Sequence, residues 1–129
     1  MERKTIASTH IWNLFKTSKS PVTFHEIDRY LKQKQVAPNK STIYRILDKL
    51  LNNHKISQIT TKEGKSYYEL QSHSHHHHFI CNSCHKAFCL KSCHIDSQKI
   101  NLSQLLPNAK FSIDSHDFNL YGVCDSCSV

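Results

Sequence analysis

The sequence predicts an α+β fold in two parts, residues 1–72 and 73–129, and three observations support this prediction. Three stretches with the 3.6-residue periodicity of amphipathic helices precede two short β-type runs, all within the first 70 residues. The same 70 residues contain 13 Lys/Arg against 6 Asp/Glu, so they carry the whole net charge of +7. All six cysteines and eight of the eleven histidines follow residue 72. We therefore expect a basic first domain and a second domain rich in metal ligands.

The first two helices are predicted from periodicity and a capping signal. The first helix ends near Lys19, and its apolar positions recur at the spacing i, i+3, i+4: Ile11, Leu14 and Phe15. The second begins at the T-x-x-E capping box formed by Thr23 and Glu26, and it points three side chains inward: Ile27, Tyr30 and Leu31. Residues 35–39, which include a proline, should end this helix.

A third helix and a hairpin complete the first domain. Residues 41–51 place five apolar side chains on one helical stripe: Ile43, Ile46, Leu47, Leu50 and Leu51. Two β-type runs follow at residues 55–61 and 66–70, joined by a glycine-containing turn at 62–65. Three helices followed by a hairpin are typical of winged helix-turn-helix proteins. We therefore expect a winged-helix DNA-binding domain over residues 1–72.

The polar face of the third helix is the candidate recognition surface. An arginine can contact guanine in a bidentate manner, and a tyrosine ring can pack against a thymine methyl group. Hydroxyl groups at a helix N-terminus and lysines in a hairpin turn suit phosphate. The alternative is the solvated face that every amphipathic helix has. We predict contacts with double-stranded DNA for six residues: Ser41, Thr42, Tyr44, Arg45, Lys62 and Lys65.

Two C-x-x-C pairs dominate the second part. Cys81 and Cys84 form the first pair, Cys124 and Cys127 form the second, and 39 residues separate them. Two such pairs can close the tetrahedral shell of one structural Zn²⁺ per chain. The alternatives are two disulfides or two redox motifs. The N-terminal residues lack the apolar core of a secretory signal, and no run approaches the roughly 18 apolar residues of a membrane span. We thus expect a cytoplasmic protein, without membrane contact, whose thiols stay reduced.

A histidine run links the two parts. Residues 73–78 read His-Ser-His-His-His-His and directly precede an apolar segment. If the run is extended, His75 and His77 project to one side, while His76 and His78 project to the other. The run can thus supply two ligands to each of two metal sites. Imidazole suits zinc, ferrous iron, nickel and copper, so the run does not identify the metal.

Four motifs in order, over nearly the whole chain, resemble those of the ferric uptake regulator superfamily: S-T-I-Y-R-I-L, Y-Y-E-L, H-H-H-H-F-I-C-x-x-C and H-D-F-N-L-Y-G-V-C-x-x-C. The resemblance implies a homodimeric winged-helix repressor whose small C-terminal α/β domain dimerises. It assigns the structural zinc to Cys81, Cys84, Cys124 and Cys127. It also implies a regulatory hinge site with Glu69, His76 and His78, and an additional site with His75, His77, Asp96 and His116.

The chain departs from the family pattern at several positions. Pro21 stands where the hinge site often has a histidine, Cys89 replaces a carboxylate, and His77 replaces an aspartate. Both ligand changes exchange hard oxygen for softer donors, which favours Zn²⁺ over Fe²⁺. We therefore predict a regulatory zinc site of Glu69, His76, His78 and Cys89. The alternative is a buried Cys89 thiol, with His25 or water as the fourth ligand. No role follows for three further residues: His85, Cys93 and His94.

These observations predict a repressor that binds operator DNA as a homodimer when the hinge metal, favoured to be zinc, is bound. An iron-responsive repressor is the first alternative, and a metal-buffer protein is the second. A zinc enzyme is disfavoured because His25-Glu26 lacks the second histidine of H-E-x-x-H, having Arg29 instead. The deaminase pattern is also missing, since Ile80 stands where it requires proline before Cys81.

Overall fold

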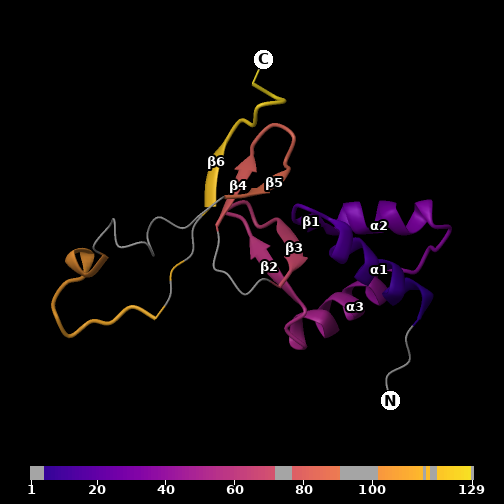
Figure 1. Ribbon diagram of the computed structural model, residues 1–129, viewed down its shortest axis with the longest axis horizontal. Coiled ribbons are helices and arrows are strands. Elements are labelled where there is room, and N and C mark those ends of the chain that lie inside the picture. Colours follow the sequence, from indigo (N-terminus) through magenta and orange to yellow (C-terminus); the bar gives the residue numbers. More distant parts are fainter. Residues whose placement is uncertain (1–4, 72–76, 91–101, 115, 117–118, 129) are drawn as a thin grey trace. The chain divides into compact units, whose positions relative to one another are not determined.

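The computed structural model describes residues 5–71, 77–90, 102–114, 116 and 119–128 (Figure 1). The chain divides into two compact units, Met1–Ser72 and His73–Val129. The roles that the sequence assigns to the two parts remain predictions. Five residues named above lie outside the described residues: His75, His76, Cys93, His94 and Asp96. Among the described helices, none is long and apolar enough to cross a membrane.

The first unit contains three helices and a three-stranded antiparallel sheet (Figure 1). The predicted order of three helices followed by two strands is confirmed. The elements are α1 (Ile6–Thr17), β1 (Val22–Thr23), α2 (Phe24–Gln33), α3 (Lys40–Asn52), β2 (Ile56–Thr60) and β3 (Ser66–Leu70). Helix α1 ends two residues before the predicted Lys19, because the backbone of Ser18 is extended, although its N–H still donates to the Leu14 carbonyl.

Side-chain caps fix where the second and third helices begin. The Thr23 hydroxyl accepts a hydrogen bond from the Glu26 N–H over 3.2 Å, as the capping signal predicts. Asn39 lies in the segment predicted to end α2, but its side chain accepts from the Thr42 N–H over 2.9 Å and caps α3. Helix α3 therefore begins at Lys40, one residue earlier than predicted.

The core of the first unit lies between the helices and the sheet. Helices α2 and α3 contribute the fully buried pairs Ile27 and Leu31, and Ile43 and Leu47. The remaining buried members come from α1 and the sheet: Ile11, Phe15, Val22, Ile56 and Tyr68. The prediction that Tyr30 points inward is wrong. Its ring is half-buried outside this core, with the Lys34 ammonium 5.5 Å from its centre.

The hairpin of β2 and β3 has the predicted turn. Strand β3 lies in the centre of the sheet, with Ile56 opposite Leu70 on one side and Val22 opposite Tyr68 on the other. At the turn, the Gly64 N–H donates to the Thr61 carbonyl over 2.9 Å. Gly64 has φ of +84°, a conformation that residues with a Cβ adopt only at a cost.

The second unit is built on a sheet of order β5-β4-β6 (Figure 1). Strand β4 (His78–Cys81) pairs antiparallel with β5 (Ala87–Cys89) and parallel with β6 (Asn119–Gly122). A short 3₁₀ helix, η1 (Leu102–Leu105), lies between β5 and β6 in the sequence. Gly122 permits close packing here, because a Cβ at this position would lie 3.2 Å from the Phe79 ring.

Candidate metal centre and the outward face of the third helix

The parallel pairing of β4 and β6 brings the two C-x-x-C pairs together. Parallel strands end at the same edge of a sheet, and Cys81 at the end of β4 lies opposite Gly122 at the end of β6. The second pair begins two residues later, at Cys124. The Asn82 N–H donates to the Gly122 carbonyl over 2.7 Å and links the two loops.

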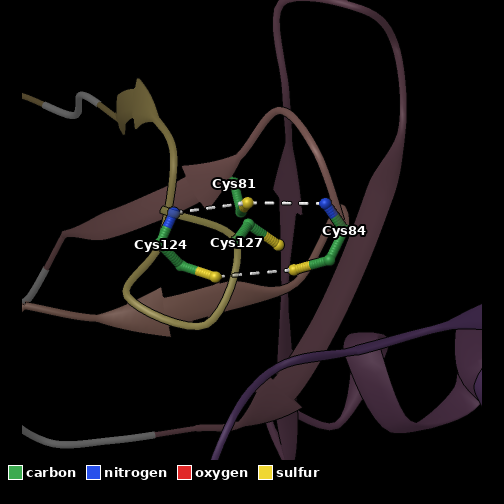
Figure 2. A group of neighbouring side chains, drawn as sticks. All are labelled: Cys81, Cys84, Cys124 and Cys127. Carbon is green, nitrogen blue, oxygen red and sulfur yellow. Dashed lines mark hydrogen bonds between the residues drawn. The ribbon is translucent and has the colours of Figure 1, made fainter. Parts of the chain in front are cut away.

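The four cysteine sulfurs converge on one point between the loops (Figure 2). All four lie within 4.8 Å of one another. The Cys84 and Cys124 sulfurs are 3.8 Å apart. Zn–S bonds of about 2.3 Å in a tetrahedron place sulfurs about 3.8 Å apart, whereas a disulfide needs about 2.05 Å. The donor set and its spacing therefore fit a closed Zn²⁺ site, and the four cysteines are free thiols.

Backbone groups favour the thiolate form of Cys81. The N–H groups of Cys84, Cys124 and Ser83 each donate to its sulfur over 3.4 Å. These bonds lower the pKa of Cys81 from 9.0 to about 6, against the opposing effect of desolvation. At Cys127 a hydrogen bond from Ser83 lowers the pKa, but the neighbouring thiols, Cys124 first, and desolvation outweigh it and raise the pKa to about 11. The backbone thus stabilises Cys81 in the thiolate form, which is the form that binds metal.

The first metal-binding loop depends on an unusual backbone conformation at His85. This residue has φ of +64°, and its N–H donates to the Cys81 carbonyl over 2.9 Å. The left-handed conformation turns the chain back into β5, and glycine adopts it without a Cβ clash. The sequence predicts no role for His85, and the structure adds this left-handed turn of the backbone.

Two residues of the predicted regulatory site form a cross-strand pair. His78 on β4 lies opposite Cys89 on β5, with its ring nitrogen within 4.8 Å of the sulfur. His78 is buried, whereas Cys89 is exposed, so the alternative of a buried Cys89 thiol is wrong. Glu69 lies on β3 in the first unit and is half-buried, and His25 is an exposed residue of α2. The regulatory site and the membership of all four residues in it remain predictions.

Two of the four residues predicted for the additional site lie among the described residues. His77 is only 2% exposed, and its ring centre is 5.0 Å from that of His116. His116 is half-buried. Two imidazoles at this separation can share a metal ion. His75 and Asp96, the other predicted ligands, lie outside the described residues.

The outward face of α3 carries the predicted DNA contacts. Arg45 is exposed, and Tyr44 is 47% exposed. The Ser41 and Thr42 hydroxyls donate to the Asn39 side chain over 2.8 and 2.9 Å, so a phosphate would have to replace these bonds. In the hairpin, Lys62 and Lys65 are exposed at the turn. None of these residues has a tested role, and each remains a predicted contact.

The chain thus consists of a basic unit with three helices and a hairpin, followed by a unit whose four clustered cysteines are the donor set of a structural metal site. The model of the "Ferric uptake regulator family" matches residues 3–121. The chain therefore belongs to the ferric uptake regulator family.

Three relatives illustrate the range of this similarity. The "Ferric uptake regulation protein" of Campylobacter upsaliensis is 28% identical over 103 residues, which cover 77% of this chain and 64% of the relative. The chain thus spans less than two thirds of that relative's length. The ferric uptake regulator of Francisella tularensis with iron superposes with a TM-score of 0.81 at 23% identity, covering 98% of this chain and 94% of that one. A zinc-bound manganese uptake regulator gives 0.74 at 22% identity, covering 95% and 91%. These two structures show a shared fold.

Proposed function

We propose that this chain is a metal-responsive transcriptional repressor that binds operator DNA as a homodimer. Family membership supports regulation over catalysis. The observation that carries the proposal is the exposed pair Tyr44 and Arg45 on α3, in the unit that carries the chain's net positive charge. In this proposal the first unit is a winged helix whose third helix enters the major groove, while Lys62 and Lys65 at the hairpin turn contact phosphate.

The four-cysteine cluster is proposed to hold a structural Zn²⁺. All four tetrahedral positions are filled by sulfur, which leaves no open position for substrate or water. The ion would fasten the ends of β4 and β6 to each other. This role requires reduced thiols, which a cytoplasmic location would maintain.

Zn²⁺ is favoured as the regulatory metal over Fe²⁺. The support is the His78 and Cys89 pair, since a thiolate and an imidazole suit Zn²⁺ better than the oxygen ligands preferred by harder cations. We propose that His76 and Glu69 complete this site, and that His75, His77, Asp96 and His116 form the additional one. Metal would act by binding more tightly to the DNA-competent arrangement than to others. Iron is the second candidate, because relatives of this fold include a regulator with bound iron.

The second unit is proposed to form the homodimer. Strand β6 pairs with β4 along one edge, and no other described strand pairs with its second edge. Two large apolar side chains near this edge are about half exposed, Leu120 at 48% and Val123 at 53%. An edge strand with exposed apolar side chains favours pairing with another chain, and a second copy would supply one.

Selection from a random DNA library tests the proposal. The zinc-loaded full chain is incubated with random duplexes, and bound sequences are recovered, amplified and sequenced. We expect a two-fold symmetric motif whose binding is lost with EDTA and restored by metal. If the bound duplexes show no sequence preference and are retained equally in EDTA, the metal-buffer alternative is favoured instead.

A further inference from the structure

Two aromatic rings from neighbouring helices stack at the proposed DNA-binding face. The rings of Phe24 and Tyr44 have centres 4.5 Å apart and planes inclined by 19°. Phe24 is the first residue of α2, whereas Tyr44 lies on the outward face of α3. One face of the exposed Tyr44 ring is therefore covered by Phe24. Stacked aromatic pairs at such distances are attractive beyond the area that they bury.

Three features of the first unit position Phe24. Its ring is half-buried and packs against the core of the first unit. Its backbone directly follows Thr23, which caps α2 and pairs with Tyr67 of the sheet. The cap, the strand pairing and the core together fix the position of the Phe24 ring, so this ring forms a rigid platform rather than a mobile neighbour.

Tyr44 has a second neighbour from the sheet. Tyr68 is buried, and its pKa is raised by burial, with the proximity of Tyr44 and then Asp48 adding to the effect. Tyr44 is thus close enough to Tyr68 of β3 to influence its ionisation. A side chain that is stacked on Phe24 has fewer rotamers to lose when it meets a ligand.

We propose that Phe24 is a positioning residue for DNA recognition, which holds the Tyr44 ring in the orientation that meets a base edge. The inference rests on the proposed function of α3. It assigns a specificity role to a residue of α2 that need not touch DNA. Because ordering a flexible side chain at an interface costs binding energy, removal of the platform should weaken binding to the cognate duplex by about 2- to 12-fold.

The test uses the zinc-loaded full chain, the duplex that the wild-type protein selects, and a scrambled duplex of equal length. Phe24→Leu keeps an apolar side chain in the core but removes the stacked ring. We expect about 2- to 12-fold weaker binding to the selected duplex and unchanged binding to the scrambled one. Phe24→Tyr, which restores a ring, should retain the wild-type ratio. Leu14→Ala, a change in a partly buried residue of α1 on the same core, controls for a general loss of stability.

Two further measurements separate positioning from stability. In a Tyr44→Ala background, Phe24→Leu should have no additional effect on the selected duplex. In protein labelled with 3-fluorotyrosine, the ¹⁹F signal of Tyr44 should move on Phe24→Leu and stay in place on Leu14→Ala, because only the first change removes the stacked ring.

Several outcomes would overturn the inference. The first is a Phe24→Leu protein whose affinity ratio between the selected and scrambled duplexes equals that of the wild type. The second is an equal loss of affinity for both duplexes. The third is the full loss of affinity from Phe24→Leu in the Tyr44→Ala background. If Tyr44→Ala itself leaves the selected duplex bound normally, the inference is wrong because there is nothing to position. If no duplex is selected at all, the proposed function is wrong. A selected duplex that depends on Tyr44 but not on Phe24 refutes only the inference.

Discussion

Replacement of one zinc ligand should unfold the second unit while the first stays folded. The described part of this unit has few buried apolar side chains beyond Ile80 and Ala87. Burial of an isoleucine contributes about 1.5–3 kcal/mol. A structural Zn²⁺ bound by cysteines contributes about 10–16 kcal/mol, which is as large as the whole stability of an ordinary domain. The metal therefore outweighs the described apolar core several times over, and Cys84→Ser should remove most of this contribution.

The effect of Cys84→Ser is read from zinc content and from the folded state of each unit. Native mass spectrometry after mild chelation should show loss of the tightly bound zinc. In a ¹H–¹⁵N spectrum, signals from the first unit should persist, because its core of helices and sheet contains none of the four cysteines. Ser126→Ala, an exposed change in the second metal-binding loop, should behave as wild type. A Cys84→Ser protein that keeps its zinc and its second-unit signals would refute the four-cysteine site.

Three further predictions follow from the site geometry. Arg45→Ala should weaken binding to the selected duplex by about 1–3 kcal/mol and relax the base preference at one position per half-site. Lys62→Ala should weaken binding to all duplexes alike and reduce the salt dependence of binding. Equal losses from Arg45→Ala on the selected and scrambled duplexes would contradict base reading. Cys89→Ala should raise the zinc concentration required for DNA binding on the order of tenfold or more, while the structural zinc stays bound. An unchanged zinc response would show that Cys89 is not a ligand of the regulatory metal.

The helices of the first unit could be predicted because their signals are local. Apolar spacing located Ile43 and Leu47 in the core, and the Thr23 cap marked the start of α2. The two-residue strand β1 could not be predicted, because it exists only through its pairing with Tyr67 and Tyr68 of β3. Asn39 was treated as part of a break because a capping side chain and a turn-forming side chain look alike in sequence.

The spacing of the cysteines predicts the metal centre only in part. Two C-x-x-C pairs indicate four ligands, but the parallel pairing of β4 with β6 is what brings them to one edge, and spacing does not encode it. The left-handed backbone at His85 and the stacking of Phe24 on Tyr44 were likewise hidden, since both depend on the folded chain. Histidine and cysteine patterns show which donors are present, and the fold decides which of them meet.

Control of DNA binding by metal can be measured directly in one titration. Protein that keeps its structural zinc but has its weaker sites emptied is mixed with the selected duplex under reducing conditions. Zn²⁺, Fe²⁺, Mn²⁺ and Ni²⁺ are then added separately while fluorescence anisotropy is followed. We expect DNA binding to be weak without added metal and to be restored by Zn²⁺ at the lowest free concentration. Full binding without added metal would contradict metal control, and activation by Fe²⁺ at concentrations where Zn²⁺ has no effect would contradict the zinc assignment.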